Sequence, residues 1–375
     1  MQTNNVILPP KTIGIIGGGQ LGRMMAIAAR YMGYKIAVLD PTPDCPTAQV
    51  ADVQITADYD DMNAIKELTK ISDVVTYEFE NVDLDAATYI EAQGKLPQGA
   101  FALEVTQNRE KEKSTIRDLG LPVPNFSIVK NGEEAEIALQ DVRLPAVIKT
   151  CRGGYDGKGQ LKIETDADKA DAVKFAEEQG HCIIEEWITF DKEISVVFSR
   201  SLQGDIAFFP ISENEHRDHI LYKTTVPANV SEAVQEKAYQ AARLLGEKMK
   251  IVGTFAIEMF VRGDEIYLNE MAPRPHNSGH YSIEACNVSQ FDQHVLAICG
   301  LPLKPIELLQ PAIMVNILGE DIDDLLDYVK TNPYGHSHLY GKAAAKVKRK
   351  MGHITFVGKD MEDVLSQVEQ YEKSK

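Results

Sequence analysis

The chain has 375 residues and a formal net charge of −17 at pH 7. This length predicts two or three domains, and the acidic balance argues against a general surface for nucleic acids or anionic membranes. No apolar run approaches the ~20 residues of a membrane span, no basic, apolar leader precedes the first strand, and the five cysteines form no CxxC pair. We therefore expect a cytoplasmic protein with reduced thiols and no nucleic-acid or membrane partner.

The first hundred residues alternate short β-rich runs with helical stretches. The pattern predicts strands at 12–16, 35–39 and 73–77, with a helix at 21–30 between the first two. Strands connected through helices in this way form a parallel sheet. We expect a Rossmann-like domain over residues 1–105.

A glycine-rich turn follows the first of these strands. Gly17, Gly19 and Gly22 stand at G-x-G-x-x-G spacing, and Asp40 follows the second predicted strand. This is the outline of a dinucleotide-binding turn, so an NAD-dependent dehydrogenase is one hypothesis. The motif is weak evidence by itself, because the Pro-Thr-Pro after Asp40 offers nothing specific for the ribose of NAD.

A second glycine-rich loop follows the strand predicted at 146–150. Four glycines between residues 153 and 159 allow the backbone to approach an anion closely, and Lys149 and Lys158 add positive charge. No GKS or GKT follows, so the loop is not a P-loop. It is either a phosphate-binding loop or a flexible hairpin loop.

The next apolar strand, at 182–188, ends in Glu-Glu-Trp-Ile. It is either a core strand with solvated acids, or a segment whose backbone binds the edge of an adenine while Glu193 accepts hydrogen bonds from ribose hydroxyls. Beyond it, the pattern predicts an antiparallel pair of strands at 195–199 and 205–210 and a helix at 231–249.

Two glutamates stand on a predicted hairpin with strands at 253–261 and 266–271. A three-residue loop centred on Asp264 would pair Glu258 directly with Glu270 on one face of the hairpin. Two facing carboxylates repel each other unless a cation lies between them, and Mg²⁺ favours one or two carboxylates together with phosphate oxygens. The alternative is an exposed acidic hairpin.

Two polar segments follow. The loop at 272–280 places Arg274 between two prolines, ahead of several hydrogen-bonding side chains. It either lines one side of a substrate site or is a turn with incidental polar residues. After the break at 301–305, the segment 341–353 concentrates five Lys and Arg residues, which form a solvated face, a nucleic-acid patch or a pocket for a small phosphate. In so acidic a chain we favour the pocket. Strand alternation there predicts that residues 348 and 349 face opposite ways, and an amphipathic helix is expected near 360–372.

In this order, the segments resemble the ATP-grasp superfamily. The shared features are the βαβ domain, Arg109 within QNREKEK, Lys149 with its glycine-rich loop, EEWI and the paired glutamates. Within the superfamily, TYEFENV at 76–82, NEMAPRPHNSGH at 269–280 and YGK with RKMGH between 340 and 353 resemble the N5-carboxyaminoimidazole ribonucleotide synthetase (PurK) family. The run AAAKVKRK departs from the family, which more often has arginine and glycine before RKMGH.

The resemblance implies a mixed α/β and α+β architecture. An ATP-grasp domain would span 106–305, with a lid subdomain at about 123–187, between the N-terminal Rossmann-like domain and a small, mainly β C-terminal domain at 306–375. In this family the N-terminal glycine-rich turn belongs to a domain that helps bind the ribonucleotide, not a dinucleotide.

The resemblance also implies the site residues. The ATP-binding set is Arg109, Lys149, Gly154, Tyr155, Asp156, Gly157, Lys158, Gly159, Gln160, Glu185, Glu186, Trp187, Ile188, Glu193, His216, Asn269 and Glu270. The substrate-binding set is Gln20, Leu21, Glu80, Asn81, Arg274, His276, Asn277, Ser278, Lys342 and Arg349. Tyr155, Asp156, Arg274 and His276 form the catalytic set, and Glu258 and Glu270 the Mg²⁺ ligands.

The implied reaction begins with attack of bicarbonate on the γ-phosphate of ATP. The resulting carboxyphosphate releases CO₂ beside the amine of aminoimidazole ribonucleotide, and the product, N5-carboxyaminoimidazole ribonucleotide, belongs to purine biosynthesis. Family resemblance also suggests a homodimer. The alternatives are another ATP-grasp ligase such as formate-dependent glycinamide ribonucleotide transformylase, an NAD-dependent dehydrogenase and a non-enzymatic nucleotide sensor.

Overall fold

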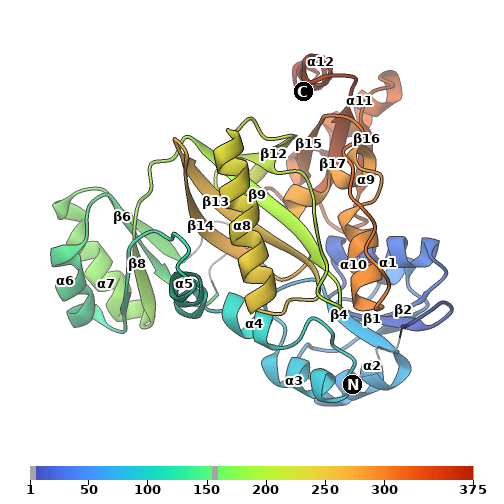
Figure 1. Cartoon of the computed structure of the whole chain (residues 1–375), viewed down its shortest axis with the longest axis horizontal. Coiled ribbons are helices and arrows are strands. Elements are labelled where there is room, and N and C mark those ends of the chain that lie inside the picture. Colours follow the sequence, from blue (N-terminus) through green and yellow to red (C-terminus); the bar gives the residue numbers. More distant parts are fainter. Residues whose placement is uncertain (1–5, 154–158, 375) are drawn as a thin grey trace.

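A computed structural model describes residues 6–153 and 159–374. Three β-sheets organise the chain: an N-terminal sheet, a small sheet that lies apart from the rest, and a long sheet that runs through the centre to the C-terminus (Figure 1). Helices cover these sheets, and the broad face of α8 (Glu232–Lys248) packs on the long sheet. The mixed α/β and α+β architecture expected from the sequence is confirmed.

The N-terminal sheet is parallel, with strand order β3-β2-β1-β4. Its strands are almost wholly apolar because helices cover both faces, as is usual for parallel sheets. The predicted strands and the first helix are confirmed to within a few residues. The elements are β1 (Thr12–Ile16), α1 (Gln20–Tyr31), β2 (Lys35–Leu39), η1 (Ala48–Val50), β3 (Val53–Ile55), α2 (Met62–Ile71), β4 (Val74–Tyr77), α3 (Leu84–Ala92) and α4 (Phe101–Thr106).

The small sheet is antiparallel, with strand order β5-β8-β6-β7, and we call it the lid sheet. Two helices pack their alanine and leucine side chains on one of its faces, which leaves the other face to the cleft described below. Helix α5 (Arg109–Asp118) precedes it. The elements are β5 (Phe126–Val129), α6 (Gly132–Asp141), β6 (Ala146–Thr150), β7 (Gln160–Ile163), η2 (Asp166–Asp168), α7 (Lys169–Gln179) and β8 (Cys182–Glu186).

The long sheet has nine strands and is shared by the central and C-terminal parts of the chain. Its order is β14-β13-β9-β11-β12-β15-β17-β16, with β10 paired to β9. The strands are β9 (Lys192–Arg200), β10 (Ile206–Phe208), β11 (Ser212–Arg217), β12 (Ile220–Val226), β13 (Gly253–Arg262), β14 (Glu265–Ala272), β15 (Ala312–Leu318), β16 (His336–Leu339) and β17 (Lys350–Val357). Because β12 pairs with β15, the C-terminal strands extend the central sheet rather than forming a sheet of their own.

Helices of the C-terminal half connect this sheet to the N-terminal domain. Helix α10 packs Phe291 and Val295 against Met24 and Met25 of α1, in one apolar cluster. The remaining elements are η3 (Asn277–Gly279), α9 (Ser282–Ala285), α10 (Gln290–Ile298), η4 (Gly319–Asp321), α11 (Ile322–Thr331) and α12 (Met361–Lys373). Among the described residues, no helix is both long and apolar enough to cross a bilayer.

Two expectations about local structure are wrong. The hairpin between β13 and β14 turns through two residues, Gly263 and Asp264, rather than three, and Gly263 adopts a φ of +58°, which glycine tolerates well. In the basic run, strand β17 begins only at Lys350, while Lys348 lies in a turn with a φ of +63°. Alternation along a strand therefore does not apply to residues 348 and 349.

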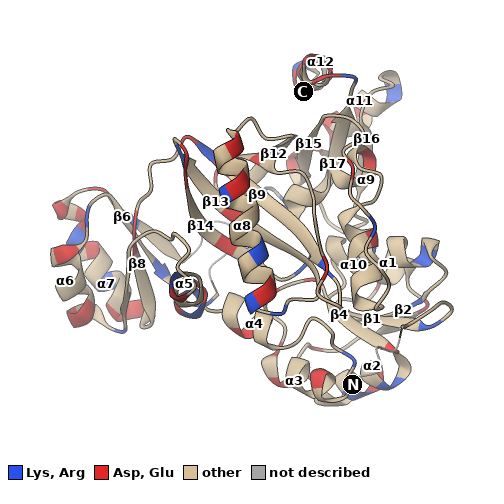
Figure 2. Ribbon diagram, in the orientation of Figure 1, with Lys and Arg blue, Asp and Glu red and all other residues tan. Residues whose placement is uncertain are grey.

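Charged residues are distributed unevenly over these elements. Figure 2 shows acidic segments recurring along α6, whereas α8 carries both signs. The chain as a whole carries a net charge of −17.

Candidate active site

A cleft of about 1110 Å³ lies between the lid sheet and the long sheet. It collects most of the predicted site residues: Glu80, Asn81, Arg109, Lys149, Gln160, Glu185, Glu186, Trp187, Ile188, Glu193, His216, Glu258, Asn269, Glu270, Arg274, His276 and Asn277. The described lining does not include Gln20, Leu21, Gly159, Ser278, Lys342 or Arg349. Predicted residues 154–158, with Tyr155 and Asp156, lie outside the described residues.

The two hairpin glutamates face each other as predicted, but the strand register that pairs them differs from the predicted one. The strands keep one register from the turn to the pair Met259–Leu268. The next pair is Glu258 with Glu270, so the register changes there. Asn269 is the extra residue of this β-bulge, and it moves the register by one position. The bulge therefore places both carboxylates at the cleft, where a regular two-residue hairpin would have paired Glu258 with Asn269.

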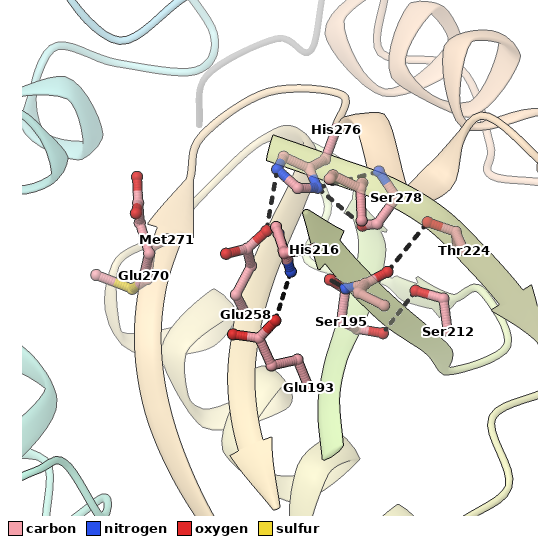
Figure 3. Close-up of polar contacts among 12 residues, drawn as sticks. Glu193, Ser195, Ser212, His216, Thr224, Glu258, Glu270, Met271, His276 and Ser278 are labelled. Atoms are coloured by element: carbon pink, nitrogen blue, oxygen red, sulfur yellow. Dashed lines mark hydrogen bonds and ion pairs between the residues drawn. The ribbon is translucent and has the colours of Figure 1, made fainter. Parts of the chain in front are cut away.

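Two histidines border Glu258 (Figure 3). Nε2 of His276 lies 3.5 Å from a carboxylate oxygen of Glu258, and Nδ1 of His216 bonds to the carboxylate of Glu193. Burial and the charge of Glu270 raise the pKa of Glu258 to about 7. Burial alone would lower the pKa of His216, but the hydrogen bond and charge of Glu193 outweigh it and raise that pKa. Neighbouring carboxylates contribute to both pKa shifts, which indicates excess negative charge at this site.

A buried network of charges underlies the lid side of the cleft. Glu185 accepts a 2.7 Å hydrogen bond from Lys149 and lies 3.4 Å from the ammonium group of Lys113, whose side chain has 0% exposure. Although burial would raise the pKa of Glu185, the two lysines lower it to about 2. The carboxylate of Glu185 thus stays ionised and holds Lys149 in place.

Glu112 and Lys113, both of which are buried, were not predicted as site residues from the sequence. Glu112 accepts a 2.6 Å hydrogen bond from the backbone N–H of Met271, beside Glu270, and burial followed by the charge of Glu270 raises its pKa to about 8. A signal was present, since Arg109, Glu112 and Lys113 stand at i, i+3 and i+4 and share a helix face with buried Ile116.

The polar loop after β14 is held rigidly on the other side of the cleft. Buried Gln290 accepts a hydrogen bond from the backbone N–H of His276 at 2.9 Å and donates one to the carbonyl of the same residue at 2.7 Å. Arg274 forms an ion pair with Glu80 of the N-terminal domain. Ser278 lies 2.8 Å from Nδ1 of His276, so it orients that ring from outside the cleft lining.

The N-terminal glycine-rich turn is filled by the protein's own carboxylates. The backbone N–H of Gly18 donates to Asp40 at 2.7 Å, and those of Gly19 and Gly22 donate to Glu78, the latter at 2.7 Å. In a dinucleotide-binding turn the same amides face a pyrophosphate. Because Asp40 and Glu78 already accept from these amides, the motif does not indicate NAD binding here.

Lys342 lies near this turn and near Arg349, and the described lining of the cleft includes neither cation. Gly341 accepts a 2.9 Å hydrogen bond from Gln49, which attaches the basic segment to the N-terminal domain. Burial lowers the pKa of Lys342 to about 8, Arg349 and Lys350 add to the shift, and Glu78 opposes it. Lys342 thus connects the cations of the C-terminal segment to Glu78.

Comparisons with known proteins match this arrangement along nearly the whole chain. The ATP-grasp domain model matches residues 114–291, the ribonucleotide synthetase preATP-grasp domain residues 10–107, and the phosphoribosylaminoimidazole carboxylase C-terminal domain residues 312–367. The N5-carboxyaminoimidazole ribonucleotide synthase of Bacillus subtilis is 48% identical over 367 residues, which are 98% of this chain and 96% of the relative.

The chain belongs to the N5-carboxyaminoimidazole ribonucleotide synthase family. This confirms the resemblance drawn from the sequence, and it makes the chain an ATP-dependent ligase of the ATP-grasp type. The family carboxylates aminoimidazole ribonucleotide at the expense of ATP, a reaction of purine biosynthesis.

Solved structures support the same assignment. The Staphylococcus aureus synthetase complexed with ADP has a TM-score of 0.92 and 42% identity, with 99% of each chain covered. The Aspergillus clavatus enzyme, in complex with ADP and aminoimidazole ribonucleotide, has a TM-score of 0.90 and 31% identity, with 97% of this chain and 98% of that chain covered.

Proposed function

We propose that the cleft binds ATP and aminoimidazole ribonucleotide side by side and uses bicarbonate as the carbon source. The observation that carries this proposal is the contact between the two groups of residues: His276 of the polar loop lies 3.5 Å from Glu258 of the hairpin. Residues suited to an ATP phosphate and its cation therefore adjoin residues suited to a second substrate. The relative solved with ADP and aminoimidazole ribonucleotide supports the same pairing of ligands.

Glu258 and Glu270 fit a divalent cation, which we propose to be Mg²⁺. The two carboxylates oppose each other across the bulged hairpin. Burial, and after it the charge of Glu270, raises the pKa of Glu258, and a bound cation would offset that repulsion. Hard oxygen ligands of this kind suit Mg²⁺, which also binds nucleotide phosphates. When bound, it would neutralise charge on those phosphates.

The protein's own cations position the nucleotide in this proposal. Lys149 is fixed by Glu185 and faces the cleft, while Arg109 lies 4.0 Å from Glu270. Both can neutralise phosphate oxygens, and phosphoryl transfer depends on such positioning and charge stabilisation more than on covalent catalysis. The predicted contacts of residues 154–158 with phosphate stay a prediction.

In the proposed reaction, an oxygen of bicarbonate attacks the γ-phosphorus of ATP, and the bond to ADP breaks. Carboxyphosphate then separates into CO₂ and phosphate, and the amine nitrogen of the ribonucleotide attacks CO₂ and loses one proton. Burial, with Arg274 adding, lowers the pKa of His276 well below its ordinary value. His276 is therefore neutral at neutral pH and serves as a hydrogen-bonding group rather than a cation.

The test is an assay of ADP release with ATP, Mg²⁺, bicarbonate and aminoimidazole ribonucleotide, omitting each in turn. We expect full turnover only with all four, together with formation of the carbamate product. If formate replaces bicarbonate, or if the ribonucleotide has no effect, the proposed substrates are wrong. ATP binding without any turnover would indicate a nucleotide sensor instead.

We also propose that the enzyme works as a cytoplasmic homodimer. The five cysteines are free and buried, which fits a reducing compartment, and the family resemblance suggests the dimer. Sedimentation of the purified chain should give twice the 41.6 kDa chain mass. A monomer that is fully active would contradict the dimer without affecting the reaction.

A further inference from the structure

Three side chains that can bind a metal meet outside the cleft, where β16 and β17 lie against α9. Glu284, His338 and His353 each offer one ligand atom, and these atoms all lie within 4.8 Å of one another. His338 and His353 are direct partners across the two strands, and their rings stack with centroids 4.6 Å apart. The described lining of the cleft includes none of the three.

The polar atoms of this cluster are incompletely paired. Nε2 of His338 lies 2.5 Å from Oε1 of Glu284. Oε2 of Glu284 and Nε2 of His353 are buried and have no hydrogen-bond partner among the described residues. A buried polar atom without a partner is costly, so two of them in one small cluster point to a further ligand there.

A tyrosine orients one of the rings. The hydroxyl of Tyr340 lies 2.8 Å from Nδ1 of His353, and both side chains are buried. When Nδ1–H donates to this hydroxyl, Nε2 keeps its lone pair and is free to bind a metal. Metal-binding histidines usually have such a partner on the second ring nitrogen, which fixes the tautomer and the ring.

We propose that Glu284, His338 and His353 form a binding site for one divalent transition-metal ion, with Zn²⁺ as the best fit. Two imidazoles and one carboxylate are a common zinc donor set, completed by water. Mg²⁺ fits less well, since it prefers oxygen ligands and an octahedral shell. The ligand atoms must draw slightly together, because Zn²⁺ lies about 2.0–2.2 Å from each ligand.

The surroundings give the site an entry path and a role. The side chain of His338 is 34% exposed, so an ion can reach the cluster from solvent. On the inner side, the ring of His353 lies 4.9 Å from that of His280, which ends the polar loop bordering the active site. The ion would therefore join the C-terminal strands to α9 behind this loop, without touching the reacting atoms.

The first experiment is calorimetric titration of the metal-free full-length chain with Zn²⁺, in excess Mg²⁺ and without nucleotide. We expect one tight site per chain. His338→Ala should weaken it by at least about 10-fold, and Tyr340→Phe by about 10- to 100-fold, as for loss of a group that orients a metal ligand. The matched control is His336→Ala, since His336 is exposed on the same strand and outside the cluster.

The acidic cleft is the competing location for Zn²⁺, and Glu270→Gln distinguishes the two. The proposal predicts that Glu270→Gln keeps the tight site and His338→Ala loses it. The opposite result places the ion at the active site and overturns the proposal, as does equal affinity in His336→Ala and His338→Ala. Circular dichroism of each variant separates lost binding from lost folding, and His338→Cys, which restores a zinc ligand, should recover binding.

Discussion

Glu258 pairs directly with Glu270 across the β13–β14 hairpin because Asn269 is inserted as a bulge between the two registers. The pairing sets two carboxylates at one place on the cleft wall, and Arg109 lies 4.0 Å from the second of them. Such an arrangement is destabilising unless cations neutralise it. We therefore expect a bound cation to stabilise this hairpin, as the proposed Mg²⁺ site requires.

Replacing Glu270 should abolish turnover while the fold persists. Glu270→Gln removes one charge from a side chain that is 52% exposed, so no core packing is lost. We expect kcat to fall roughly 10²-fold or more, by analogy with the loss of other electrostatic groups in active sites. Glu265→Gln, an exposed change on the same hairpin, is the control in steady-state assays. A kcat for Glu270→Gln within a few-fold of the control would contradict the proposed cation site.

Metal binding should weaken as the pH falls below about 7. Burial and Glu270 raise the pKa of Glu258 to about 7, so below this pH a proton competes with the metal for the carboxylate. We expect the affinity for Mn²⁺, a paramagnetic substitute for Mg²⁺, to drop up to about 10-fold per pH unit below 7 and to level off above 8. Spin-resonance titrations across this range measure it. Glu258→Gln should bind weakly with a flatter pH profile, and an unchanged profile would show that another group titrates.

The basic segment should discriminate between the two substrates. Lys342 lies near both Arg349 and Glu78, whereas Lys348 pairs with Asp218 at 2.9 Å. We expect Lys342→Ala and Arg349→Ala to raise KM for the ribonucleotide about 10-fold or more, with little effect on KM for ATP, because a charge-assisted contact to its phosphate is lost. Lys348→Ala should stay within about twofold. If Lys348→Ala has the largest effect, this assignment of the phosphate contact is wrong.

Lys113 should matter for stability more than any exposed lysine of its helix. Its removal leaves the buried carboxylate of Glu185 with Lys149 as the one ion-pair partner that remains among the described residues. Breaking a buried ion pair costs about 3–5 kcal/mol, so Lys113→Met should lower the apparent free energy of unfolding by that order. Lys111→Met, at an exposed pair on the same helix, should change it by less than about 1 kcal/mol. Urea denaturation compares the two, and equal stabilities would contradict a structural role for the network.

Much of the site could be read from the sequence because local patterns carry the information. Short apolar, β-rich runs and the turns between them predicted β1, β2, β6 and the β13–β14 hairpin, and motif order pointed to the family. Lys149, Glu258 and Glu270 were found from these patterns and Arg109 from the family resemblance, and all four line the cleft. Charged residues at the ends of strands and helices can be recognised from the local sequence, because the adjacent residues show where the element lies and which side of it is exposed.

Other features of the site depend on contacts between residues far apart in the sequence, and only the tertiary structure shows them. The sequence alone determined that the chain is an acidic, multidomain ATP-grasp ligase with a glycine-rich turn near its start. Only the fold shows that Glu78, 56 residues after Gly22, fills that turn, that Asn269 bulges, and that Lys113 is buried against Glu185. The physical reason is that burial, register and charge pairing are set by side chains brought together from different elements, and no local periodicity encodes them.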